Sequence, residues 1–168
     1  MYLQTMYMHR TMQTPRQPQK PRKTLRHDAR DLVEACAGWN TRLAARRITQ
    51  FLDRAVAKQG LSVAQLGLMA QIAVTADDTL SALAERTGLD QSTLSRNLRT
   101  LEAEGLVEIA VVGTDQRRRM AWLTEHGARR LESAIPLWRK AQARLAKRLS
   151  PELARQLADA TQALVRTP

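Results

Sequence analysis

The sequence predicts a mainly α-helical protein with one small β-hairpin, and three observations support this fold class. Ala, Leu, Arg and Gln dominate the 168 residues, while aromatic residues make up only 4%, a composition that favours helix. Apolar residues recur at helical spacing along most of the chain. One stretch of β-branched and aliphatic residues, followed by a short polar turn, is typical of a hairpin.

Two short helices are predicted just before the hairpin. The first covers residues 81–87 and ends at Gly88, since glycine accepts the left-handed conformation common at helix ends. The second covers residues 91–104, with Asp90 as a favourable N-cap. Two helices joined by a tight turn containing Gly form a helix-turn-helix.

The second of these helices has two contrasting faces. Leucines at i, i+4 and i+7 predict a buried stripe made of Leu94, Leu98 and Leu101. Another face is polar and cationic, and consists of Ser92, Ser95, Arg96 and Arg99. Such a helix fits the major groove of B-DNA, where Ser, Gln and Arg bond base edges and phosphates. The alternative is that this face is only solvated.

The hairpin is predicted from strands over residues 106–112 and 119–124, with a turn at 113–116. Arg117, Arg118 and Arg119 lie near its tip beside one acid, Asp115. A narrow minor groove attracts inserted arginine, although three arginines on a turn can also serve solubility alone. The order of helix, turn, helix, strand, basic turn and strand favours DNA binding.

This stretch resembles the winged helix-turn-helix of the MarR (multiple antibiotic resistance regulator) family. The wing of that family has Asp, one residue, Arg, five residues, then Leu-Thr. Asp115, Arg117, Leu123 and Thr124 have that spacing here. The segment at 92–107 and the Glu-His-Gly that follows Thr124 also fit, and the resemblance covers roughly residues 32–165.

The resemblance implies a sequence-specific DNA-binding transcription regulator, a repressor released by a small-molecule or oxidant signal. It implies that Asp115 orients Arg117, that Arg117 enters the minor groove, and that the second short helix faces bases and phosphates. The residues and the resemblance together predict these DNA contacts: Ser81, Gln91, Ser92, Thr93, Ser95, Arg96, Arg99, Asp115, Arg117, Arg118 and Arg119.

The charge balance points independently to a polyanionic partner. The net charge is +11 and the pI is about 11.1, which favours nucleic acid first and an anionic membrane surface second. The alternatives to a regulator are therefore a sequence-tolerant, nucleoid-type DNA-binding protein, a membrane-surface protein, and an interaction scaffold. The single cysteine, the lack of a spanning apolar run and the lack of a visible secretory signal lead us to expect the cytoplasm and no membrane partner.

Four segments are predicted along the chain. Residues 1–27, with six basic and no acidic residues, form a basic flexible arm or an extended translation start. Residues 28–62 hold one long helix, from residue 28 to about residue 58, and form the first half of a dimerisation region. Residues 63–124 form the winged helix-turn-helix lobe, whose first helix begins at a capping box of Ser62 and Gln65. Residues 125–168 hold a further long helix and a last helix that together complete the dimerisation region.

The helices on both sides of the lobe have apolar stripes that nothing within the chain covers fully. The family resemblance implies that a second copy covers them, giving a homodimer. A two-fold dimer predicts a pseudo-palindromic operator in double-stranded DNA, with half-sites roughly 10 bp apart. The alternative is a monomer whose terminal helices pack together.

Catalytic chemistry is not expected. The three histidines are too scattered for a metal cluster, and no phosphate-binding glycine loop or nucleophile–base pair occurs. We therefore expect no enzyme, no cofactor and no metal.

The signal has two candidate sites. Cys36 could sense oxidants, because the organic hydroperoxide regulators of the family use a cysteine in the first helix. Cys36 is however offset by about two residues from that position, and Leu52 and Val63 stand where that branch has paired tyrosines. A buried apolar role for Cys36 is the alternative. A small aromatic effector is the other signal, in a cavity lined by Trp39, Met69 and Trp138, which are otherwise core residues.

Overall fold

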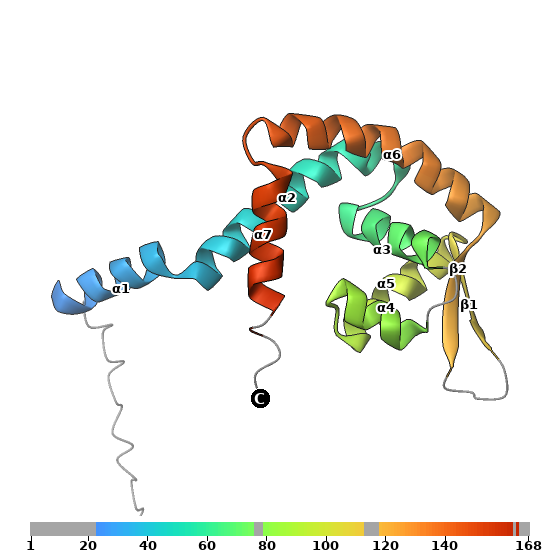
Figure 1. Cartoon of the computed structure of the whole chain (residues 1–168), viewed down its shortest axis with the longest axis horizontal. Coiled ribbons are helices and arrows are strands. Elements are labelled where there is room, and N and C mark those ends of the chain that lie inside the picture. The colour runs from blue at the N-terminus through green and yellow to red at the C-terminus, as the bar shows by residue number, and fades with distance from the viewer. Residues whose placement is uncertain (1–22, 76–78, 113–117, 163, 165–168) are drawn as a thin grey trace, which may run out of the picture. The chain divides into compact units, whose positions relative to one another are not determined.

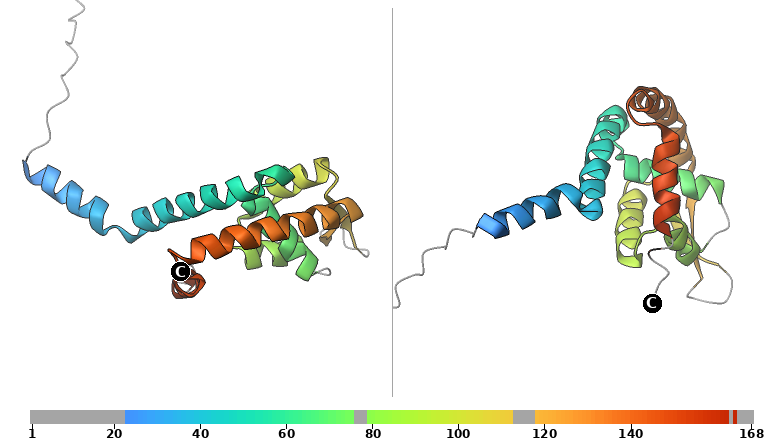
Figure 2. Two further views of the ribbon diagram at one scale, coloured as in Figure 1. Left: turned by 90° about the horizontal axis from the view of Figure 1, so that it is seen from above. Right: turned by 60° about the vertical axis from the view of Figure 1, so that its left-hand side comes forward.

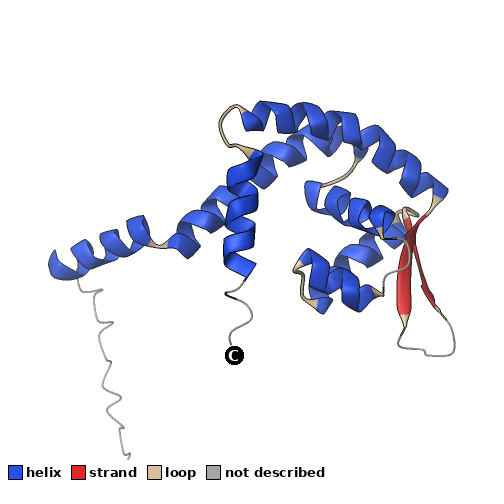
Figure 3. Cartoon of the chain, in the orientation of Figure 1, coloured by secondary structure: helices blue, strands red, loops and turns tan. Residues whose placement is uncertain are grey.

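The computed structural model describes residues 23–75, 79–112, 118–162 and 164. Helices make up most of these residues, and the two strands among them pair as one antiparallel hairpin (Figures 1 and 3). The predicted fold class, mainly α with a hairpin wing, is confirmed. The described residues fall into two compact units, divided between Arg42 and Leu43. No helix among the described residues is long and apolar enough to cross a membrane.

The first unit contains helix α1 (Lys23–Ala35) and the beginning of helix α2 (Ala37–Val56). The single helix predicted over residues 28–58 is therefore wrong in two respects: helix begins five residues earlier, and it is interrupted at Cys36. Residues 23–27, which the sequence assigned to a flexible arm, belong to α1. The rest of that predicted arm lies outside the described residues.

The interruption at Cys36 is stabilised locally. Its Sγ atom accepts a hydrogen bond from the backbone N–H of Trp39, at 3.4 Å, at the start of α2. The side chain of Asn40 donates to the carbonyl oxygen of Glu34, at 2.9 Å, from the other side of the break. Side chains thus supply partners for backbone groups at the break.

Among its described residues, the second unit contains the rest of α2, six further helices and two strands. The order is the 3₁₀ helix η1 (Ala57–Gln59), α3 (Val63–Val74), α4 (Leu80–Thr87), α5 (Gln91–Ala103), β1 (Val107–Val111), β2 (Arg119–Leu123), α6 (Glu125–Ala146) and α7 (Pro151–Gln162). The capping box predicted at Ser62 and Gln65 is present, with backbone-to-side-chain bonds of 2.8 and 3.1 Å between them. Gly88 ends α4 at a φ of 65°.

The core of the second unit lies between α3, α5, α6 and the hairpin. Helix α3 packs against α6 and β2, and α5 packs against β1; the views in Figures 1 and 2 agree that these elements lie together. The predicted leucine stripe of α5 is buried, together with Met69 and Leu106. This core fixes α5 on one side and leaves its opposite face to solvent.

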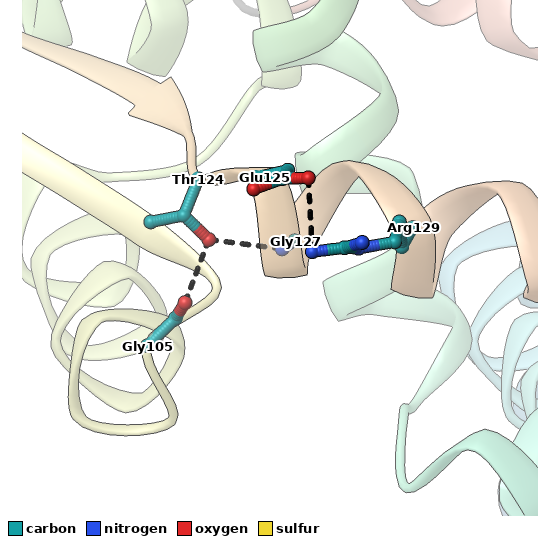
Figure 4. A network of polar contacts seen from close by, with 5 residues as sticks. All are labelled: Gly105, Thr124, Glu125, Gly127 and Arg129. Carbon is teal, nitrogen blue, oxygen red and sulfur yellow. Dashed lines mark hydrogen bonds and ion pairs between the residues drawn. The ribbon is translucent and has the colours of Figure 1, made fainter.

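A tight joint connects the end of α5 to the start of α6 (Figure 4). Thr124 is the N-cap of α6: its hydroxyl accepts from the N–H of Gly127, at 2.9 Å, and donates to the carbonyl of Gly105, at 2.7 Å. A Cβ atom on Gly127 would lie 1.9 Å from the carbonyl oxygen of Leu106. Only glycine allows this approach of helix and backbone.

Candidate nucleic-acid interface

Helix α5 begins at a carboxylate that binds three groups. Asp90 Oδ1 accepts from the Ser92 hydroxyl at 2.5 Å and from the Thr93 N–H at 2.8 Å, and Oδ2 accepts from the Thr93 hydroxyl at 2.8 Å. These hydrogen bonds, first that of the Ser92 hydroxyl, hold the pKa of Asp90 well below its ordinary value. Asp90 is therefore a carboxylate at neutral pH, and the predicted N-cap is confirmed.

The outward face of α5 contains the residues predicted to contact DNA. Gln91, Ser92, Arg96 and Arg99 are exposed, whereas Thr93 and Ser95 are half-buried. Because the leucines occupy the opposite face, this surface is free of the core. A helix presenting such side chains has the dimensions and donors that the major groove accepts.

Tertiary packing brings residues of α4 and β2 to the same surface. Ser81, Gln91, Ser95 and Arg119 line a hollow of about 200 Å³ whose other lining residues are leucines of α4 and α5. An isolated bridge from Thr79 to Met120 of β2 accompanies this arrangement. Four of the predicted DNA-contacting residues, from three elements, thus share one site.

The β1–β2 hairpin, which forms the wing, includes Arg119 in the lining of this hollow. In the hairpin Val111 is paired with Arg119, and beyond it the N–H of Val112 donates to the carbonyl of Arg118, at 2.9 Å. Arg118 and Arg119 are both exposed. Asp115 and Arg117, the residues of the family's wing motif, lie outside the described residues, so their predicted roles remain predictions.

The four residues predicted for a signal differ in their surroundings. Met69 is 0% exposed and belongs to the core, the alternative that the sequence left open for it. Trp138 is half-buried and lines a mostly apolar hollow of about 330 Å³ between α3 and α6, with Leu66, Leu131 and Ile135. Met69 does not line this hollow.

Cys36 and Trp39 lie in the first unit. They line a hollow of about 440 Å³ together with Leu32 and Val33. Cys36 is half-buried, while Trp39 is 56% exposed. Among the described residues no group of three His, Cys, Asp or Glu side chains is placed to hold a metal ion.

The sequence did not single out a cationic hollow between α2 and α6 of the second unit. Arg47, Arg144, Lys147 and Arg148 line this space of about 560 Å³, and no acidic residue lines it. The guanidinium of Arg144 lies 5.5 Å from the centre of the Phe51 ring. No local sequence pattern predicts this site, because its basic residues come from segments that lie far apart in the sequence.

Comparisons with known proteins agree with this geometry. Residues 59–118 match a family model described as MarR family. The transcriptional regulator MosR of M. tuberculosis, solved in complex with DNA, is 37% identical, with a TM-score of 0.71 over 79% of this chain and 99% of MosR. The chain belongs to the MarR family. It is thus a winged helix member of a family of DNA-binding transcription regulators.

Two further matches define what is shared. A mutant of the E. coli regulator MarR, solved with operator DNA, has a TM-score of 0.67 at 21% identity, over 80% of this chain and 96% of that one; this shows the MarR fold. The phenylalanine–tRNA ligase alpha subunit of Pyrococcus horikoshii is 36% identical over 69 residues. That match spans 41% of this chain but only 13% of the ligase subunit, so the similarity is limited to one segment of the ligase subunit.

Proposed function

We propose that this MarR-family protein is a dimeric repressor that binds a near-palindromic operator and is released by a chemical signal. One observation carries the DNA-binding part: the polar and cationic face of α5 is exposed beside Ser81 and Arg119. Arg96 and Arg99 contact base edges or phosphates, Ser92 and Ser95 fix the register, and the wing follows the adjacent minor groove. MosR, which is 37% identical to this chain, was solved in complex with DNA, and this supports DNA binding.

The dimer is proposed from uncovered apolar surface. In the first unit Leu32 is 66% and Trp39 is 56% exposed, and in α7 Leu153 and Leu157 are 55% and 47% exposed. Neither α1 nor α7 has a buried residue. Helices with apolar faces of this kind need a partner surface, and a second copy supplies it with two-fold symmetry. We accordingly propose residues 28–62 and 125–168 as the dimerisation segments and 63–124 as the DNA-binding lobe.

The signal is proposed to act between these segments. The Trp138 hollow contacts α3 of the lobe and α6 of the dimerisation segment, so a small aromatic ligand there would shift the separation of the two α5 helices. Oxidation of Cys36 is the second candidate. Each is tested by adding aromatic acids or an organic hydroperoxide to the protein–DNA complex and measuring release; a hydroperoxide that leaves Cys36 unmodified and DNA bound excludes the second.

Competition for DNA tests the proposed function against a protein that binds by charge alone. Fragments selected from the source genome should bind at least about 10³-fold more tightly than bulk DNA. A sequence-tolerant binder would show no such preference, and a scaffold that does not use DNA would show no salt-dependent binding at all.

Arg117 provides a separate prediction for the wing. Replacing Arg117 by alanine should weaken binding and reduce the slope of log affinity against log salt by about one, because one arginine no longer displaces counterions. The matched control is Lys140→Ala, an exposed cation of α6 outside the predicted DNA contacts, which should leave the slope unchanged. Equal slopes for Arg117→Ala and the unmodified protein would contradict the wing contact.

A further inference from the structure

The bonds at the start of α5 determine more than helix capping. A hydroxyl group has one proton to donate and two lone pairs to accept with. The Ser92 and Thr93 hydroxyls both lie within 2.8 Å of Asp90 carboxylate oxygens, and an ionised carboxylate can only accept. Each hydroxyl therefore donates its hydrogen bond to Asp90. The 2.5 Å length of the Ser92 bond is typical of a charge-assisted hydrogen bond.

Ser92 is exposed on the outward face of α5, so its remaining lone pairs are accessible to an incoming ligand. An oxygen that can only accept has no favourable bond with a phosphate, which also only accepts. In the major groove the donors are the amino groups of adenine and cytosine, whereas guanine and thymine present acceptors. The negative charge of Asp90 further offsets the positive end of the α5 dipole, which would otherwise attract phosphate.

We infer that Asp90 is a specificity-determining residue that makes Ser92 an obligate acceptor, so that the base facing Ser92 is adenine or cytosine. This inference rests on the proposed function, since it requires α5 to enter the major groove. It adds the chemical class of the group recognised, an exocyclic amino group, and it assigns Ser92 to a base and not to the phosphate backbone.

The variant Asp90→Gly tests this directly. Glycine is tolerated at an N-cap with little loss of stability, so the fold is retained and thermal unfolding checks it. Glycine has no side-chain oxygen to replace the one that now accepts from Ser92, so the Ser92 hydroxyl becomes free to donate. Site selection with the full chain, the variant Ser92→Ala and Asp90→Gly identifies the base pair whose preference depends on Ser92.

At that base pair, removing the amino group isolates the bond. A duplex carrying purine in place of adenine, or 2-pyrimidinone in place of cytosine, should bind the unmodified protein about fivefold to tenfold more weakly. The same replacement should change the affinity of Ser92→Ala and Asp90→Gly by less than about twofold. The control Glu102→Gln removes one carboxylate from the exposed side of α5 without touching these hydroxyls, and should keep the full sensitivity.

The outcomes distinguish failure of this inference from failure of the proposed function. If removal of the amino group leaves the affinity of the unmodified protein unchanged, or if Asp90→Gly remains as sensitive to the amino group as the unmodified protein, the inference is overturned. If the unmodified protein selects no preferred site, it is the proposed function that fails.

Discussion

Replacing Arg96 and Arg99 together by alanine should lower the affinity for a selected DNA site about a hundredfold or more. Both side chains are exposed on the outward face of α5, and an arginine that contacts a base contributes about 1–3 kcal/mol. The leucines that hold α5 in the core are on the other face, so the fold should be unaffected. Titration of labelled DNA at several salt concentrations measures both the affinity and the number of phosphates contacted.

The matched control removes the same charge elsewhere. Arg139 and Lys140 are adjacent exposed cations of α6, and replacing both by alanine should change affinity by less than about fivefold, through the long-range field alone. If the two double variants weaken binding equally, net charge and not the α5 surface carries DNA binding. Single variants then show whether each arginine contacts a base or a phosphate. Loss of a base contact relaxes the sequence preference at one position of the site, whereas loss of a phosphate contact weakens binding to all sequences alike.

The second large effect is expected at Gly127. In Gly127→Ala the new Cβ would lie 1.9 Å from the oxygen and 2.8 Å from the carbon of the Leu106 carbonyl, so backbone must move. Overpacking of this kind costs about 3 kcal/mol, which for a chain of this size lowers the midpoint of thermal unfolding by roughly 10 °C.

Gly67 offers the same substitution with the opposite expectation. It lies within α3, and no heavy atom is within 4 Å of its added Cβ. Alanine there should raise stability by about 1 kcal/mol, because glycine is the weaker helix former. Equal melting temperatures for Gly127→Ala and the unmodified protein would show that the joint between Leu106 and α6 is not as tight as described.

Local signals predicted most of the DNA-binding lobe. The Ser62 capping box, the Asp90 cap and the Gly88 stop are contained in a few consecutive residues, and the α5 stripe follows from spacing alone. Hairpin strands were placed within one residue of their observed ends. Such features depend on neighbours in sequence, so a sequence pattern can indicate them.

Features that depend on distant contacts could not be predicted in this way. No Pro or Gly occupies the break at Cys36, and the nearest glycine, Gly38, lies inside α2. The need for glycine at 127 comes from the Leu106 carbonyl, which belongs to another element. The alignment of Ser81 and Arg119 with α5 likewise results from packing of three elements. Asp90 was recognised as a cap, but the hydroxyl bonds that give it a further role appear only in the structure.

Selection of binding sites from random-sequence DNA by the purified full chain tests the central claim most directly. Two copies related by a two-fold axis, each with α5 in a major groove, should enrich an inverted repeat whose half-sites are centred about one helical turn apart, roughly 10 bp. Enrichment of a single unrepeated half-site, or of no sequence at all, would contradict the account.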